Sequence, residues 1–553
     1  MCRPVGSVLV RRNPPRRTGR RLVDRFFEEA LMTDIDNQPI RMTHRQILVV
    51  LTGLMLGLFL AALDQTIVAT ALPTIVGEFG GLDHLSWVVT AYLLASTVTS
   101  PLYGMISDLY GRKVVFQTAI GLFLAGSILC GFSQNMAQLI SFRAIQGLGA
   151  GGLIVMALTI VGDVVSPRER GRYQGYFGAV FGLASIAGPL LGGWFVDNLS
   201  WRWVFYINLP LGLVALFVTA TVLNIPFHRQ DHRIDFAGAG LLVGGVSALL
   251  LVTVWGGREY EWGSPLIVGL GAVGLVLVGL FLWWETRTEE PILPLRLFRD
   301  RTFALTSAAG FVVGLAMFGG IIFLPLFLQI VVGASATNSG LLLLPMMVGI
   351  IGMSVIGGRL ISRTGRYKIF PVVGTLLATL ALFLLSTMGI GTTLPVASVY
   401  MLILGAGLGL VMQVLVLAVQ NSVQPRDLGV ATSASTFFRS LGGSFGTALF
   451  GAIFTSQVAA NIARNLPGAD LGGGDLTSSP GVIAQLPEAV RVGVVQAFAD
   501  STSTVFLAAV PFAIAAFVVV LMLPELPLRD HAHVTGGEST VEGAEGLVAE
   551  GAD

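Results

Sequence analysis

Long apolar stretches separated by short polar segments make up most of the chain between residues 47 and 523. A stretch of about 20 apolar residues carries an α-helix across a ~30 Å hydrocarbon core, because each residue adds about 1.5 Å. Lipid offers the backbone no hydrogen-bond partners, so each stretch is predicted to be a helix, and none alternates like a strand of a membrane barrel. Fourteen such stretches lie at about 47–72, 86–106, 113–133, 139–164, 172–195, 203–224, 235–255, 264–285, 303–331, 339–361, 369–389, 395–420, 429–456 and 502–523. The predicted fold class is an all-α polytopic membrane protein with 14 transmembrane helices.

A short cationic segment between two of these stretches occurs twice, as GMISDLYGRKVVF at 104–116 and as GRLISRTGRYKIF at 358–370. Gly104, Gly111 and Arg112 correspond to Gly358, Gly365 and Arg366, while Asp108 corresponds to Ser362. Further along, GLGAGG at 147–152 corresponds to GAGLGL at 405–410, and PRERG at 167–171 corresponds to PRDLG at 425–429. This order and spacing predict two pseudo-symmetric six-helix halves, helices 1–6 and 9–14, with helices 7 and 8 as an inserted pair.

The repeat sets the expected domain boundaries. They are a cytoplasmic tail at 1–46, an N-terminal bundle at 47–224, the inserted pair with its loops at 225–302, a C-terminal bundle at 303–523 with a long external loop at about 457–501, and a disordered acidic tail at 524–553. The Arg-rich stretch 1–31 lacks the apolar core of a secretory signal. It is expected to be a flexible tail, unless translation begins at Met32 or Met42, and it could also bind anionic lipid.

The charge content agrees with a surface that faces lipid. Charged residues are 12% of the chain, about half of the roughly 25% found in soluble domains. The net charge of +1 gives no reason to expect a nucleic-acid partner. Most Lys and Arg residues lie in the tails and in the loops that follow even-numbered helices, so the positive-inside rule predicts that both termini are cytoplasmic.

Common sequence motifs for catalysis and cofactor binding are missing from the chain. There is no GxxxxGK[ST] loop for ATP, no HExxH or CxxC metal spacing, and no His inside an apolar stretch. The two cysteines, Cys2 and Cys130, give no disulfide framework. We therefore expect no metal, no cofactor and no enzyme activity.

Asp64 is the acidic residue that lies well inside an apolar stretch, whereas most other acids lie at helix ends. An ionisable group at that depth costs free energy and indicates function, here the binding and release of a proton. Counting about 1.5 Å per residue from the outer helix ends places Arg143 within about 5 Å of the same depth. A permanent pair would be structural, whereas a pair that breaks on protonation would be part of the mechanism. We favour the second interpretation.

The repeated loops predict a mechanical role. Two halves related by an axis along the membrane normal can rock about a central site, which opens the site to each side in turn. Gly104 lets helices approach closely, Gly111 permits a tight turn, and Asp108 can pair with Arg112 or with a helix N-terminus. The alternative is an ordinary positive-inside turn. The predicted cytoplasmic gate consists of Gly104, Asp108, Gly111, Arg112, Gly358, Gly365 and Arg366.

Helix 5 is rich in small residues, which predicts a flat face for close packing and a kink at its proline. These residues are Gly178, Gly182, Gly188, Pro189, Gly192 and Gly193. Aromatic and amide side chains elsewhere are candidates for a substrate cavity, although packing and lipid-facing roles are equally compatible with each one. These candidates are Gln65, Gln146, Phe323, Phe327, Gln329, Gln413, Phe437, Phe438 and Arg439.

Four motifs in order over about residues 45–525 resemble the major facilitator superfamily, and more narrowly its fourteen-helix drug:proton antiporter family. They are LDQTIVATALPTI at 63–75, GMISDLYGRK at 104–113, RAIQGLGAGG at 143–152 and GAVFGLASIAGPLLGG at 178–193. The resemblance implies that Asp64 couples transport to protons, and that helix 5 seals a proton leak and marks export rather than uptake. Ser362, in place of an acid, departs from the loop signature.

The expected function is proton-driven export of lipophilic or cationic drug-like compounds across a bacterial cytoplasmic membrane by a protein that is a monomer. Export of an endogenous lipid, siderophore or metabolite by the same mechanism is the closest alternative. A membrane-embedded sensor or enzyme subunit is the least favoured one.

Overall fold

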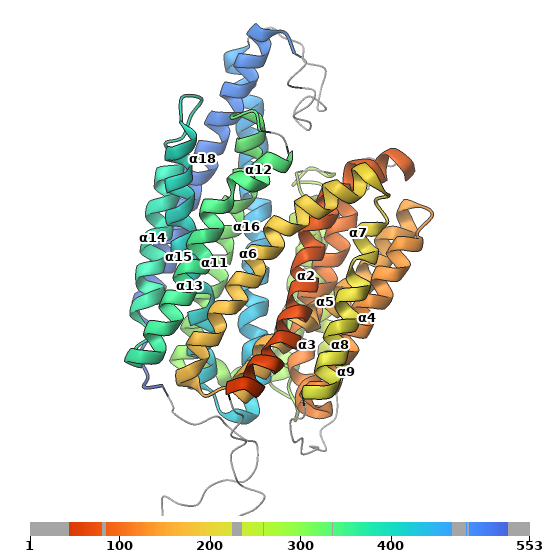
Figure 1. Cartoon of the computed structure of the whole chain (residues 1–553), viewed down its shortest axis with the longest axis vertical. Helices are drawn as coiled ribbons and strands as arrows, with labels where there is room; N and C mark the ends of the chain where they lie inside the picture. The colour runs from red at the N-terminus through yellow and green to blue at the C-terminus, as the bar shows by residue number, and fades with distance from the viewer. Residues whose placement is uncertain are drawn as a thin grey trace, which may run out of the picture. The chain divides into compact units, whose positions relative to one another are not determined.

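The computed structural model describes residues 44–79, 85–223, 235–257, 259–334, 336–466, 483 and 486–528. Regular structure in these residues is helical (Figure 1), apart from an isolated bridge between Gly256 and Tyr260. The predictions for both tails and for most of the loop after residue 466 lie outside the described residues.

The helices follow the predicted apolar stretches closely. The first group is α2 (His44–Phe79), α3 (Leu85–Tyr110), α4 (Arg112–Phe132), α5 (Met136–Val164), α6 (Pro167–Asn198), α7 (Trp203–Tyr206) and α8 (Asn208–Val222). Next come α9 (Phe236–Trp255), α10 (Pro265–Glu285) and the 3-10 turn η2 (Leu295–Arg299). The last group is α11 (Arg301–Ile330), α12 (Ala336–Leu342), α13 (Leu344–Thr364), α14 (Ile369–Leu385), α15 (Leu394–Ser422), η3 (Pro425–Asp427), α16 (Leu428–Asn465) and α18 (Glu488–Leu521).

Within the described residues, 12 helices are long and apolar enough to cross a membrane. This confirms the all-α membrane class. α14 is apolar but has only 17 residues, and α3 is not among the 12. The count of fourteen crossings therefore stays a prediction.

Two helices extend beyond the apolar stretches predicted for them. The external loop was expected at about 457–501, but α16 continues to Asn465 and α18 already begins at Glu488. Both extensions carry polar residues such as Arg464 and Arg491, so hydropathy drops while the helix continues.

The two helix groups repeat the same pairings. In the first group α2 packs on α6 and α8, and α5 packs on α3 and α4. In the second group α11 packs on α16 and α18, and α15 packs on α13 and α14. Each group encloses its own apolar core, one around Phe116, Phe123 and Phe177, and one around Phe327, Phe450 and Phe506.

Glycines allow close backbone contact inside each group. A Cβ at Gly149 of α5 would lie 2.7 Å from the carbonyl oxygen of Ala119 in α4. A Cβ at Gly405 of α15 would lie 2.8 Å from the backbone carbonyl carbon of Met346 in α13. Real Cβ atoms do not come this close to backbone, so these helix pairs need glycine at the crossing.

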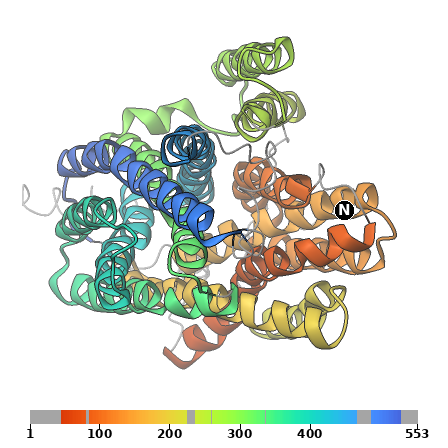
Figure 2. The same ribbon diagram turned by 90° about the horizontal axis from the view of Figure 1, so that it is seen from above.

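The inserted pair, α9 and α10, lies at the edge of the helix assembly (Figure 2). α9 packs on α3 of the first group and on α16 of the second. The segment after α10 is held by Glu285, whose carboxylate accepts hydrogen bonds from the backbone N–H groups of Ile292 and Leu293 at 3.1 and 3.2 Å. Arg296 of η2 then donates two hydrogen bonds, of 2.8 and 2.7 Å, to the carboxylate of Asp427, just before α16.

The end of α2 is tied to the segment that follows α6. Arg202 forms an ion pair with Glu78 at 2.9 Å, and the Trp201 indole N–H donates to the same carboxylate at 2.6 Å. These two contacts, with that of Arg202 the larger, hold the pKa of Glu78 below its ordinary value.

Replacing Gly405 with alanine should lower the thermal stability of the purified protein. The new methyl group would press on the Met346 backbone, and overpacking of this kind costs about 1–3 kcal/mol. The matched control is Gly352→Ala in α13, where a Cβ meets nothing within 4 Å. The midpoint of thermal unfolding in detergent measures both changes. Equal midpoints for the two variants would contradict the proposed close crossing.

Candidate functional site

Asp64 lies inside the first helix group, and its side chain is 0% exposed. It is placed there by α2, which is apolar on either side of it. Arg143 of α5 is 1% exposed and forms an ion pair with the Asp64 carboxylate. The predicted contact between these two residues is thus confirmed, and the acid faces the interior of the bundle rather than lipid.

Three donors hold the Asp64 carboxylate. Arg143 donates to Oδ2, while the amide nitrogens of Gln146 and Asn208 donate to Oδ1 at 2.7 and 3.1 Å. Arg143 also donates from Nη1 to Gln146 Oε1 at 2.7 Å. The four side chains form one buried polar cluster around the acid.

The surroundings fix the Arg143 guanidinium. Its Nε donates to the carbonyl oxygen of Val88 at 3.1 Å, and its Cζ lies 4.2 Å from the centre of the Tyr92 ring. Tyr92 donates its hydroxyl to the carbonyl oxygen of Ala61 at 3.0 Å, one turn before Asp64. α3 therefore braces both partners of the ion pair.

Sequence reasoning missed part of this cluster. Asn208 was not singled out, although an amide inside an apolar stretch was a usable signal. Its Nδ2 also donates to Ser127 Oγ at 3.0 Å, and its Oδ1 is buried without a hydrogen-bond partner among the described residues. Gln146, which the sequence analysis predicts in a substrate cavity, donates a hydrogen bond to Asp64 and is 0% exposed.

The first predicted gate loop lies where α3 meets α16 of the other group. A Cβ at Gly104 would contact Ser433 Oγ and lie 2.7 Å from the carbonyl oxygen of Gly429. Arg112 bridges Asp108 at 2.6 Å and Asp163 at 2.8 Å. We name this region the charged seam. It comprises the contact of Gly104 with Gly429 and Ser433 and the adjacent ion pairs of Arg112.

The charged seam also places an acid at a helix start. A Cβ at Gly429, the second residue of α16, would lie 2.8 and 2.9 Å from the two carboxylate oxygens of Asp108. A carboxylate so close to a helix N-terminus is stabilised by the partial positive charge there.

The second gate loop lies where α13 meets α6. A Cβ at Gly358 would overlap the carbonyl oxygen of Gly171, and one at Gly175 would lie 3.0 Å from that of Ser354. We name this contact, from Gly171 and Gly175 to Ser354 and Gly358, the backbone seam. Across it Arg168 donates from Nε to the carbonyl oxygen of Ser362 at 3.4 Å.

Gly111 lies at a tight turn, as predicted, and Gly365 lies at a similar turn in the second half. They adopt φ values of 88° and 70°, a region that disfavours side chains. Arg366 differs from Arg112, because its side chain is exposed and forms no ion pair with a described residue.

The predicted helix 5 is α6 in the structure, and its glycines divide into two sets. Gly178 and Gly182 face α13, with Cβ positions 2.9 Å from Ser354 Oγ and 2.8 Å from Ile351 Cδ1. Gly188 and Gly192 face α2 instead, where their Cβ positions would contact Thr66 and Thr70. α6 thus packs on the other group with its first half and on the Asp64 helix with its second.

Gly193 and Pro189 of α6 belong to neither of these two sets. A Cβ at Gly193 would meet nothing within 4 Å, so this glycine is not part of a close-packed face. Pro189 lies inside the continuous helix α6. Thr66 of α2 donates to the carbonyl oxygen of Ala184 at 2.9 Å, close to the turn from which proline removes a hydrogen bond.

The predicted substrate residues are not gathered in one place. Phe323, Phe327 and Phe437 are buried in apolar cores and are 6%, 2% and 5% exposed, so they do not line an open surface here. Large aromatic side chains pack well inside helix bundles, and a role of these residues in substrate binding stays a prediction. The side chains of Gln65, Gln329, Phe438 and Arg439 are partly exposed.

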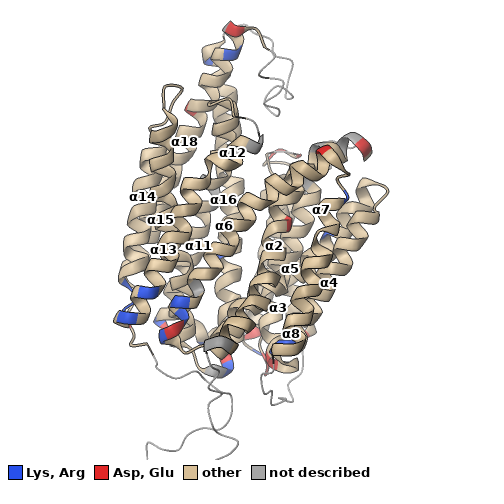
Figure 3. Ribbon diagram, viewed as in Figure 1, with Lys and Arg blue, Asp and Glu red and all other residues tan. Residues whose placement is uncertain are grey.

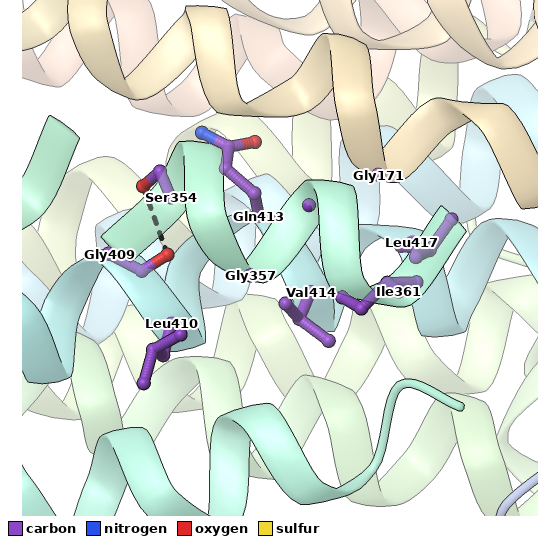
Figure 4. A pocket seen from close by; sticks show the side chains of 10 residues that line it. Gly171, Ser354, Gly357, Ile361, Gly409, Leu410, Gln413, Val414 and Leu417 are labelled. Carbon is purple, nitrogen blue, oxygen red and sulfur yellow. Dashed lines mark hydrogen bonds between the residues drawn. The ribbon is translucent and has the colours of Figure 1, made fainter. Parts of the chain in front are cut away.

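Gln413 lies beside a narrow pocket at the backbone seam, where α6, α13 and α15 meet (Figure 4). Gly171, Ser354 and Gly358 line the same pocket, and Ser354 donates to the carbonyl oxygen of Gly409 at 3.0 Å. The Gln413 Oε1 atom is buried without a partner among the described residues.

Comparison with known proteins gives consistent results. A family model described as Major Facilitator Superfamily matches residues 54–447. The chain is 46% identical over 485 residues to an uncharacterized MFS-type transporter of Mycobacterium tuberculosis (strain CDC 1551 / Oshkosh), an alignment that covers 87% of this chain and 70% of the relative. It is 44% identical over 407 residues to the multidrug transporter protein MdtP of Bacillus subtilis (strain 168), covering 74% of this chain and 75% of the relative.

Among solved structures, the proton:xylose symporter XylE is similar with a TM-score of 0.60 at 13% identity, covering 88% of this chain and 97% of that chain. At this identity the likeness concerns the fold alone. The family match covers most of the chain and agrees with the arrangement of its helices. The chain therefore belongs to the Major Facilitator Superfamily and is a multi-pass membrane transporter of small molecules.

Proposed function

We propose that this transporter is a proton-driven antiporter that exports lipophilic or cationic drug-like compounds by alternating access. The observation that carries the proposal is the fully buried Asp64, bonded to Arg143, Gln146 and Asn208 within a membrane-crossing bundle. A carboxylate kept at this depth indicates a functional proton site. The likeness to a relative named as a multidrug transporter supports the substrate class.

The proposed architecture has fourteen crossings in two related halves, 47–224 and 303–523, with 225–302 inserted between them. The repeated helix pairings support it, as do the two seams. The charged seam joins Gly104 to Gly429, and the backbone seam joins Gly358 to Gly171, which are the corresponding positions of the sequence repeat. Two equivalent contacts of this kind are what a two-fold axis along the membrane normal produces.

The proposed orientation has both termini in the cytoplasm of a bacterial cell. Figure 3 supports it, because most of the blue Lys and Arg residues of the described helices gather at the lower end. The two seams involve Arg112 and Arg168, which lie in or beside the cationic loops that the positive-inside rule assigns to the cytoplasm. In this orientation the cytoplasmic side is closed.

The proposed proton step begins at the ion pair. Protonation removes the negative charge of the Asp64 carboxylate. Arg143, Gln146 and Asn208 all donate hydrogen bonds to this group. The three donors then lose part of their stabilisation, and a protonated carboxyl needs an acceptor. Asn208 offers this acceptor, because its buried Oδ1 has no hydrogen-bond partner among the described residues. Rotation of the amide would turn this oxygen toward Asp64.

α6 is the proposed link between proton binding and the gate. It contacts the Asp64 helix through Gly188 and Gly192, and the other half through Gly171, Gly175 and Gly178. A shift of α2 on protonation therefore acts on the same helix that forms the backbone seam. One proton that crosses 100 mV supplies about 2.3 kcal/mol for this cycle.

Asp64→Asn should abolish substrate export driven by a proton gradient. Asparagine keeps the size of the side chain but cannot exchange a proton, so coupling is lost. The measurement is dye transport in inverted vesicles under an imposed pH gradient, with proton release on substrate addition as a second readout. Asp500→Asn is the matched control, since Asp500 lies in α18 and, among the described residues, its carboxylate accepts a hydrogen bond only from Gln496, four residues earlier. Proton release that survives in Asp64→Asn would refute the assignment.

Gly104→Val should hold the cytoplasmic side open. The larger side chain would collide with the backbone of Gly429, so the charged seam cannot close. Spin labels at the exposed positions Tyr110 and Ile369, one in each half, should move apart in pulsed electron paramagnetic resonance. Gly121→Val is the control, because a Cβ at Gly121 meets nothing within 4 Å. Identical distance distributions in both variants would show that the seam is not a gate.

A further inference from the structure

Arg439 lies deep within α16, eleven residues after its first residue, Leu428. At about 1.5 Å per residue this is roughly 16 Å along the helix, or about half of a ~30 Å hydrocarbon core. An arginine at that depth needs a counter-charge or a hydrogen-bond acceptor.

The other deeply buried arginines have such partners. Arg143 binds Asp64, and Arg170 donates to the carbonyl oxygens of Gly162 and Val165. Arg439, in contrast, forms no hydrogen bond or ion pair with any described residue. Its side chain is partly exposed, so the guanidinium is not sealed inside the core.

A glycine of the facing helix lies beside this cation. A Cβ at Gly310 of α11 would meet nothing closer than 3.8 Å, and its second neighbour would be Arg439 Cβ at 3.9 Å. One turn further, Gly314 approaches the carbonyl oxygen of Arg439. α11 thus presents hydrogen atoms, and not side chains, to this part of α16.

A second unsatisfied polar group lies on the same face of α11. Ser307 precedes Gly310 by three residues and Gly314 by seven, so the three positions share one helix face. The Ser307 side chain is 3% exposed, and its hydroxyl has no hydrogen-bond partner among the described residues. The Arg439 guanidinium and the Ser307 hydroxyl thus lie on two packed helices, and neither has a hydrogen-bond acceptor among the described residues. An anionic group is an acceptor for both.

We propose that Arg439 and Ser307 form an anion subsite between α11 and α16, which takes the carboxylate, sulfonate or phosphate group of a lipophilic substrate. A guanidinium binds such groups through paired charge-assisted hydrogen bonds, and a hydroxyl adds a third donor. Asp64 and Arg143 neutralise each other, so Arg439 leaves the mid-membrane region of the described helices with net positive charge. The subsite rests on the proposed export function and narrows its lipophilic substrates to those that carry an anionic group.

Transport of two probes tests the subsite. Anilinonaphthalene sulfonate is a lipophilic anion and ethidium a lipophilic cation of similar size. In inverted vesicles with an imposed pH gradient, the wild-type protein should move the sulfonate faster than ethidium. Arg439→Gln should lower sulfonate transport about tenfold or more, the usual effect of losing a charged hydrogen bond, while ethidium transport stays level or rises. Arg439→Lys should keep most of the sulfonate transport, and Ser307→Ala should lower it by a few-fold.

Arg464→Gln is the matched control, because it removes the same charge from the exposed far end of the same helix. It should change neither probe. Equal loss of both probes in Arg439→Gln, or no loss of the sulfonate, would overturn the subsite.

Direct binding separates this inference from the proposed export function. Fluorescence of the sulfonate with the purified protein in detergent needs no proton gradient. Weaker binding in Arg439→Gln than in Arg464→Gln supports the subsite even if no coupled transport is found. Equal binding in both variants overturns it even if transport is coupled. Competition by chloride alone, without selective transport of the organic anion, would mean that an inorganic ion fills the subsite and would also overturn the assignment to substrate.

Discussion

A hydrocarbon layer satisfies no polar group, so every charge placed within it must find its partner in the protein. Asp64 meets this constraint with three donors from α5 and α8, and the ring of Tyr92 in α3 braces Arg143. The packing of four helices therefore depends on one carboxylate. Any change in its charge changes what holds these helices together, and this is why a buried acid can couple a chemical event to movement.

The two helix groups keep separate main cores. Inside each group, aliphatic and aromatic side chains interlock around a large core, and glycines such as Gly149 and Gly405 occupy the closest helix crossings. Between the groups, Gly104 and Gly358 lie against the backbone of the other group, and a smaller apolar cluster joins α3 to α16. Flat glycine surfaces can part and re-form with less rearrangement than interlocked side chains. Neither large core has to be broken for the two groups to move apart.

Hydropathy alone predicted the helices, because the length of an apolar stretch is tied to the thickness of the bilayer. The sequence repeat also singled out Gly104 and Gly358, which both lie at contacts between the groups. It could not identify Asn208 or show that Phe323 is buried in an apolar core. In lipid both faces of a helix are apolar, so periodicity does not reveal which face meets a neighbour. Depth could be counted from the helix ends, and for this reason the Asp64–Arg143 contact was predictable whereas its amide partners were not.

The inserted pair makes the two seams unequal. α9 packs on α3 and α16, the helices of the charged seam, and Arg296 binds Asp427 immediately before α16 begins. That seam therefore gathers Asp108, Asp163 and Asp427 around two arginines, whereas the backbone seam has glycine contacts and a hydrogen bond from Arg168. The ion pairs of Asp108 and Asp163 are partly buried and are screened little by salt, whereas Arg296 is half-exposed. Salt should therefore act on the charged seam mainly through the Arg296–Asp427 pair, which the segment after α10 adds to it.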